Sequence, residues 1–203
     1  MSAFRDNILG LRGQRKVPEA WTVWLILPFL GIFFAAFMNL LLALLGVTLT
    51  EDPLAENDFM RTFQNRLILL ILVEAVIAPI LEELLFRRVM FGLFRRIVPL
   101  YLAALITSVL FGVLHFNLPQ GLYGFFFSLL LCEVMILYGT WIAPLIVHAA
   151  ANALALFMNT VPSVNEWAVS NSLVIVIISG LLTAGLIVLM ELILRKKAAE
   201  QKE

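Results

Sequence analysis

Residues 21–47 read WTVWLILPFLGIFFAAFMNLLLALLGV and contain no charged residue. A helix that crosses the hydrocarbon core of a bilayer needs about 20 consecutive, mostly apolar residues. The stretch is also much longer than the apolar region of a secretory signal peptide, which is about 7–15 residues long. It therefore predicts a membrane-spanning helix that the protein retains.

The composition of the whole chain agrees with this prediction. The chain has 203 residues, of which 62% are hydrophobic and 14% charged, and its mean hydropathy is +1.00. A soluble domain carries about 25% charged residues, so a soluble enzyme, a disordered chain and a coiled coil are excluded. The 14 basic and 14 acidic residues balance, so no basic surface is expected for nucleic acid. The single cysteine, Cys132, excludes an internal disulfide.

Five further segments are apolar enough to cross a membrane. Together with the first, the expected spans are 21 to about 47, about 66 to 96, 99 to about 115, about 122 to 138, about 141 to 158, and 172 to 194. Turn-forming residues are expected to connect them at 117–121 and 161–163. The sequence predicts an all-α polytopic membrane bundle of about six helices. One transmembrane domain, 21–194, lies between an N-terminal segment, 1–20, and a tail, 195–203.

The basic residues predict the orientation of this bundle. Six crossings bring all but two of the 14 basic residues to one side of the membrane. Arg61 and Arg66 fall on the other side, near several acids. Because cytoplasmic segments are enriched in Lys and Arg, both termini are expected in the cytoplasm of a multi-pass plasma-membrane protein. The residues on the cytoplasmic side are Arg5, Arg12, Arg15, Lys16, Arg87, Arg88, Arg95, Arg96, Arg195, Lys196, Lys197 and Lys202.

A few polar residues lie inside the expected spans, where each is costly and a candidate for function. Several of them are spaced four apart, which places two side chains on one face of a helix. Glu83 and Arg87 form such a pair, and this leaves Glu82, about 100° around the helix, without that partner. The full set is Glu74, Glu82, Glu83, Arg87, His115, Glu133, His148, Asn39 and Asn152.

Each of the two histidines of the chain also belongs to a pair of residues spaced four apart. His115 follows Phe111 by four residues, and His148 precedes Asn152 by four. With a rise of about 1.5 Å per residue, Glu82, His115 and His148 can lie at compatible depths in the bilayer.

Each of these features also has a structural interpretation. Glu83 and Arg87 can be an ion pair of the fold, and Phe111 can be core packing. Glu74 and Glu133 are expected to be structural, whereas the combination of both histidines with Glu82 favours function.

The residue types limit the chemistry available inside the membrane. The chain has no HExxH zinc motif, and its Asp residues all lie outside the expected spans. Ser108 or Ser128 could pair with His115, but no GxSxG turn is present. Glu and His acting together on a water molecule remain as the hypothesis from the residues alone.

Three stretches of the chain resemble one family. APILEELLFRR (78–88), LITSVLFGVLHF (105–116) and YGTWIAPLIVHAAAN (138–152) carry EExxxR, FxxxH and HxxxN in order. This pattern resembles the CPBP family, the CAAX-processing and bacteriocin-processing (Abi) intramembrane proteases. The resemblance spans roughly residues 61–159, which is the expected catalytic core. Each motif alone is common, and their order in a chain with two histidines makes them specific.

The resemblance implies an intramembrane glutamic endopeptidase that uses no cofactor and no metal. Glu82 and His115 would activate the attacking water, and His148 and Asn152 would stabilise the tetrahedral oxyanion. The resemblance implies that Glu83 and Arg87 support Glu82, and Phe111 belongs to the same motif set. The substrate would be a membrane-associated peptide or protein, which can be lipid-modified, in contact with the lipid bilayer. Neither the substrate nor the oligomeric state follows from the residues.

Two other interpretations remain open from the sequence. A non-proteolytic membrane protein, such as a scaffold, an immunity protein or a proton-coupled carrier, could use the same Glu and His residues. A zinc protease could bind its metal through Glu82, His115 and His148.

Overall fold

The computed structural model describes residues 24–47 and 67–200, and side chains up to 194. Every regular element in these ranges is a helix, as the sequence predicts. Four described helices are long and apolar enough to cross a membrane: Ile26–Leu44 (α3), Leu118–Tyr138 (α10), Ile142–Thr160 (α11) and the Ser172–Leu194 part of α13. The shorter apolar helix α9 covers Leu100–Val113. The predicted segments 1–20 and 201–203 and the residues Arg61 and Arg66 lie outside the described ranges.

The remaining predicted span is a chain of short helical segments that follow one another without a break. It consists of α6 (Leu67–Leu70), the π-helix η1 (Ile71–Ile77), α7 (Ala78–Glu83), the π-helix η2 (Leu84–Phe91) and α8 (Gly92–Phe94). The sequence predicts a helix here, and the structure contains one. The two π-helical stretches were not predicted, and π geometry often marks functional sites.

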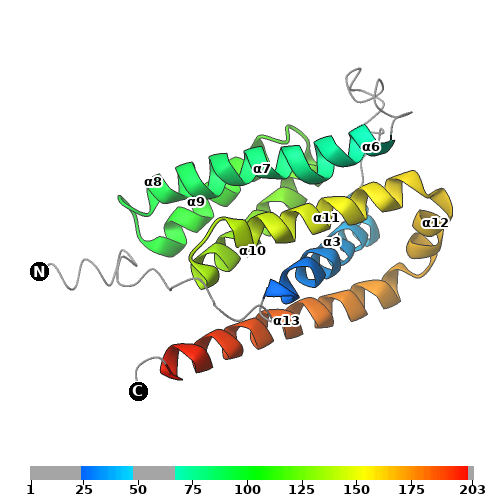
Figure 1. Cartoon of the computed structure of the whole chain (residues 1–203). Coiled ribbons are helices and arrows are strands. Elements are labelled where there is room, and N and C mark those ends of the chain that lie inside the picture. Colours follow the sequence, from blue (N-terminus) through cyan, green and yellow to red (C-terminus); the bar gives the residue numbers. More distant parts are fainter. Residues whose placement is uncertain (1–23, 48–66, 201–203) are drawn as a thin grey trace, which may run out of the picture.

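Successive segments run in alternating directions. Figure 1 shows the start of α3, the α8–α9 turn, the α10–α11 turn and the end of α13 toward one end of the bundle. The end of α3, the start of α6, the α9–α10 corner and α12 (Pro162–Ser170) lie toward the other end. This is the arrangement that six crossings would produce, and the orientation relative to the cytoplasm stays a prediction.

The core of the bundle forms where α3 packs against α11 and α13 (Ser172–Glu200). The buried side chains of α3 recur at the helical spacing of three and four residues, for example Leu27, Leu30 and Phe34. Gly31 lies on the same face, and a Cβ atom there would lie 2.2 Å from the carbonyl oxygen of Val147. A glycine is therefore needed for α3 to lie directly against the turn of α11 that precedes His148.

Two of the predicted connections differ from the structure. Most of the predicted connection 117–121 belongs to the first turn of α10, because the side chain of Asn117 accepts the backbone N–H of Gln120 at 2.9 Å and caps the helix. The connection after residue 161 contains the short helix α12, with Pro162 at its first position. Proline is favoured at that position because its missing N–H would be unpaired there in any case.

Candidate active site

A buried ion pair lies where α7 passes into η2. Glu83 and Arg87 have no exposed side-chain surface, and Arg87 Nη1 lies 3.0 Å from Glu83 Oε1. The guanidinium also lies over the ring of Phe111, with Cζ 4.7 Å from the ring centroid. The pair expected from the four-residue spacing is therefore present, and the Phe111 ring covers one face of its guanidinium group.

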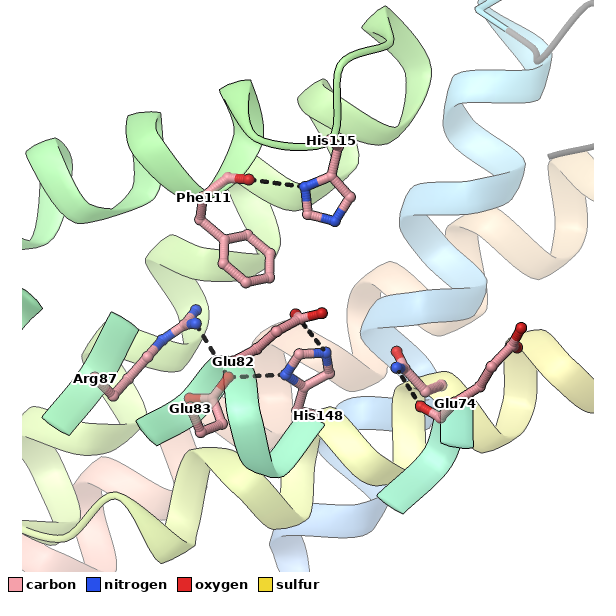
Figure 2. Close-up of polar contacts among 8 residues, drawn as sticks. Glu74, Glu82, Glu83, Arg87, Phe111, His115 and His148 are labelled. Carbon is pink, nitrogen blue, oxygen red and sulfur yellow. Dashed lines mark hydrogen bonds and ion pairs between the residues drawn. The ribbon is translucent and has the colours of Figure 1, made fainter. Parts of the chain in front are cut away.

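His148 on α11 lies between the two glutamates of α7. Its Nδ1 atom is 2.8 Å from Glu83 Oε1, and its Nε2 atom is 3.7 Å from Glu82 Oε2 (Figure 2). A carboxylate paired with arginine only accepts hydrogen bonds, so Nδ1 of His148 donates to Glu83. Nε2 is then the ring atom that faces Glu82, whose side chain is 35% exposed.

This geometry changes the expected role of Glu83. The family resemblance implied that Glu83 and Arg87 support Glu82, but the carboxylate of Glu83 contacts His148. A carboxylate that accepts from one ring nitrogen of a histidine fixes the direction in which the other nitrogen points. In the described contacts His148 therefore lies between the Glu83–Arg87 pair and Glu82.

His115 lies just beyond the end of α9, on the other side of Phe111. Its Nδ1 atom is 2.7 Å from the carbonyl oxygen of Phe111, so this nitrogen donates and Nε2 is left for other partners. The Phe111 ring contacts both histidines, with centroid distances of 5.0 Å to His115 and 6.1 Å to His148. Figure 2 shows the carboxylate of Glu82 drawn between the two imidazoles, although no direct hydrogen bond joins Glu82 to His115 among the described contacts.

A glycine on α10 provides the space for His115. A Cβ atom at Gly124 would lie 3.3 Å from Cε1 and Nδ1 of His115 and 3.3 Å from Cδ1 of Phe111. These distances are too short for most Cβ contacts, so any side chain at this position would displace the rings. Gly124 could not be predicted from the sequence, because a single glycine within an apolar run gives no signal of what it faces.

A hydrogen bond from Asn152 connects α11 to η1. Its Nδ2 atom donates to the backbone carbonyl of Glu74 at 2.8 Å. In the π-helical register Ala78 N–H donates to the carbonyl of Val73, so the next donor would be Pro79, which has no N–H. The carbonyl of Glu74 is left without that donor, and the side chain of Asn152 takes its place. The carboxyl group of Glu74 itself points away from His148 (Figure 2).

The structure also describes the other polar residues that were candidates from the sequence. Asn39 on α3 donates to the carbonyl of Ala35 at 2.9 Å, which is a bond within its own helix. Glu133 on α10 has interactions of its own, and Cys132 is buried beside it in the sequence. Ser108 and Ser128 are both fully buried, and the hydroxyl of Ser108 lies within hydrogen-bonding reach of the Cys132 thiol.

An open apolar groove of about 460 Å³ lies at the α9–α10 corner. Its lining includes Gly112, Phe116 and Asn117, which lie within three residues of His115 in the sequence. Asn117 also donates to the carbonyl of His115 at 3.0 Å, so the groove and the histidine share one turn of chain. Phe116 in this turn has a φ of 56°, a left-handed conformation that is uncommon for a bulky residue.

The three residues proposed as a zinc set do not form one in this arrangement. Within residues 24–47 and 67–200, no three His, Cys, Asp or Glu side chains come together in a way that could hold a metal ion. Glu82 and His148 are neighbours, whereas Nδ1 of His115 donates to the carbonyl of Phe111.

Comparisons with known proteins agree with the resemblance that the three motifs indicated. Residues 64–154 match the family model "Type II CAAX prenyl endopeptidase Rce1-like". A curated protein of Bacillus subtilis (strain 168), "Putative membrane peptidase YdiL", is 32% identical over 117 residues, covering 56% of this chain and 46% of the relative. The chain thus spans about half the length of that relative. No solved structure matches the chain significantly. Both matches support the resemblance to the CPBP family, and the residues that match the family model include Glu82, His115, His148 and Asn152.

Proposed function

We propose that this multi-pass membrane protein, which resembles the CPBP proteases over residues 64–154, is an intramembrane endopeptidase of the plasma membrane with Glu82 as its general base. The observation that carries the proposal is the position of the Glu82 carboxylate. It is partly exposed and lies 3.7 Å from Nε2 of a histidine that a fully buried ion pair orients. Burying the Glu83–Arg87 ion pair carries a desolvation cost that apolar side chains of similar size would avoid. A role in orienting His148 beside Glu82 would account for that cost.

In the proposed reaction Glu82 removes a proton from a water molecule, and the oxygen of that water attacks the carbonyl carbon of the substrate. His115 is the second group that orients the water, through its free Nε2. The carbonyl oxygen becomes an oxyanion, which the amide of Asn152 stabilises by donating a hydrogen bond. His148 stabilises it in the same way when its ring carries a hydrogen on Nε2 as well as on the Nδ1 that donates to Glu83. The C–N bond then breaks, and Glu82 returns the proton to the leaving amine.

Asn152 can take part while it also holds η1. The amide nitrogen carries two hydrogens, and the bond to the Glu74 carbonyl uses one of them. The second hydrogen is available to an oxyanion near His148, which lies four residues earlier on α11 and therefore on the same face of the helix.

The proposed substrate is a membrane-associated peptide or protein. The apolar groove beside His115 supports this choice, because an apolar segment of a substrate could lie there while the scissile bond reaches Glu82. Water activated by Glu and His needs no cofactor and no metal, so we expect activity to persist after treatment with a chelator. Loss of activity together with bound zinc would instead support the zinc interpretation.

The experiment that tests the proposed function compares membrane-peptide termini in cells that carry the wild type or the Glu82→Gln variant. New N-termini that appear with the wild type and disappear with Glu82→Gln would identify the substrate and the base together. Glu191→Gln, which changes a carboxylate on α13, is the matched control and should keep the wild-type termini. Identical termini in all three strains, with equal amounts of inserted protein, would contradict the proposal and favour a non-proteolytic role.

A further inference from the structure

The imidazole of His148 has an aromatic neighbour that none of the three motifs contains. This neighbour is Phe127 on α10, whose ring centroid lies 5.2 Å from that of the imidazole, with 88° between the two planes. Phe111 on α9 contacts the same imidazole at 6.1 Å and 72°. Both phenyl rings are buried. Perpendicular rings at these centroid distances are a favoured aromatic arrangement, so both contacts favour one plane for the imidazole.

The hydrogen bonds of His148 do not fix that plane by themselves. Nδ1 lies 2.8 Å from Glu83 Oε1, and this bond holds one atom of the ring. Nε2 lies 3.7 Å from Glu82 Oε2, which is longer than a hydrogen bond. The second side-chain torsion of histidine has broad energy wells, so it allows the ring to tilt. The side chains packed against the imidazole therefore decide where Nε2 points.

Phe127 is itself held by other aromatic rings. The ring of Phe34 on α3 stacks on it with a centroid distance of 5.6 Å and 30° between the planes. Tyr123, one turn earlier on α10, contacts Phe127 at 5.5 Å. Phe34 and Tyr123 also contact each other edge-on, at 6.4 Å. Because side chains in a closely packed interior have few alternative positions, Phe127 presents a fixed surface to His148.

The helix α3 thus acts on His148 although it lies outside residues 64–154, which match the family model. Gly31 and Phe34 are three residues apart on the buried face of α3. Gly31 lets α3 approach the carbonyl of Val147, and Phe34 stacks on Phe127. One face of α3 therefore contacts both the backbone beside His148 and the ring that packs against its side chain.

We propose that Phe127 is a positioning residue, which keeps the imidazole of His148 in the plane that directs Nε2 toward Glu82, with Phe34 holding Phe127 in place. Phe127 acts through His148 and needs no contact with a substrate. The positioning depends on packing alone, whereas its effect on cleavage rests on the proposed function. If His148 donates to the oxyanion, Phe127→Leu should lower kcat severalfold with little change in KM, because the ring tilts but the contacts to the substrate remain.

The motion of the imidazole tests the positioning without a substrate. In protein that carries isotope-labelled histidine and is reconstituted in lipid, solid-state NMR measures the C–H dipolar order parameter of each imidazole. A His115→Gln sample assigns the signal of His148. We expect a squared order parameter of about 0.85 in the wild type, as for rigid groups, and a value below about 0.6 in Phe127→Leu.

Phe91→Leu is the matched control. Phe91 is as buried as Phe127, at 1% exposure, but it packs in a separate core beside Cys132. The substitution should leave the order parameter of His148 unchanged. A His148 ring as rigid in Phe127→Leu as in the wild type would overturn the proposal. A mobile ring in the wild type would also overturn it, and this measurement needs no variant to fold. A ring that becomes mobile in Phe127→Leu with unchanged kcat would support the positioning and contradict the proposed role of His148 in cleavage.

Discussion

Arg87 carries a positive charge at a position where its side chain has no exposed surface. Its partners are the carboxylate of Glu83 and the face of the Phe111 ring. Guanidinium groups are more weakly hydrated than ammonium groups and stack on aromatic faces, so arginine suits this position better than lysine. The charge is therefore part of the fold, and through Glu83 it also determines how His148 is oriented.

The first prediction concerns the stability of this pair. Arg87→Met keeps much of the volume of the side chain but leaves Glu83 buried without its counter-charge, which should lower the free energy of unfolding by about 3–5 kcal/mol. Arg88→Met is the matched control, because Arg88 is exposed on the same π-helix, and its effect should stay within about 0.5 kcal/mol. Unfolding titrations in detergent measure both. Equal effects of the two substitutions would show that the pair contributes nothing.

The second prediction separates the two residues of the HxxxN motif by kinetics. If both donate to the oxyanion, His148→Ala and Asn152→Ala should each lower kcat by about 10²–10³-fold. Asn152→Ala should also cost about 1 kcal/mol of stability, because it removes the bond to the Glu74 carbonyl. Steady-state kinetics with a cleavable peptide measure kcat and KM. An increase confined to KM would assign these residues to substrate binding instead.

At the scale of the elements, the sequence predicted the helices more completely than the contacts between them. The four-residue spacings placed Glu83 with Arg87 and Phe111 with His115, because those contacts lie within one helix or turn. The contact between Glu83 and His148 joins residues 65 positions apart, and helix periodicity carries no information about such a pair. The bond from Asn152 to the Glu74 carbonyl could not be predicted from the sequence either. Pro79, which has no N–H, explains in the structure why that carbonyl needs another donor.

The third prediction concerns the contact between α9 and α10. Gly124→Ala should move the rings of His115 and Phe111 by a few tenths of an ångström, and displacements near 1 Å at an active site can cost about 10²-fold in rate. We therefore expect kcat to fall by up to about tenfold with little change in KM. Gly185→Ala on α13, where a Cβ atom would have no neighbour within 4 Å, is the control. A Gly124→Ala enzyme with wild-type kcat would contradict the positioning of His115 by this glycine.

At the scale of the whole molecule, the alternating direction of the segments agrees with the predicted number of crossings. The predicted second span was not among the four long helices, because two π-helical stretches divide it, and α9 is shorter than a typical span. Hydropathy could identify these segments as apolar but could not show the change in helix type, which depends on the backbone hydrogen-bond register within the helix. The orientation came from the basic residues, and it stays a prediction.

The fourth prediction tests that orientation. Arg96 follows α8 and Asn171 precedes α13, both are exposed, and they lie toward opposite ends of the bundle. If the positive-inside rule holds, a membrane-impermeant thiol reagent should label Asn171→Cys in intact cells and should label Arg96→Cys only after permeabilisation. The wild-type protein, in which the buried Cys132 is the single cysteine, should remain unlabelled in both conditions. The opposite pattern would place both termini outside the cytoplasm.

The length of α9 has a consequence for the surrounding lipid. The helix has 14 residues and is therefore about 21 Å long, whereas the hydrocarbon core of a bilayer is about 30 Å thick. Lipids adjust to a short apolar helix by thinning, at a cost of a fraction of a kcal/mol per ångström. His115 follows the end of this helix, so such thinning would bring the headgroups closer to it. In a bilayer this hydrophobic mismatch would shorten the path from the membrane surface to the histidine, both for water and for the proposed peptide substrate.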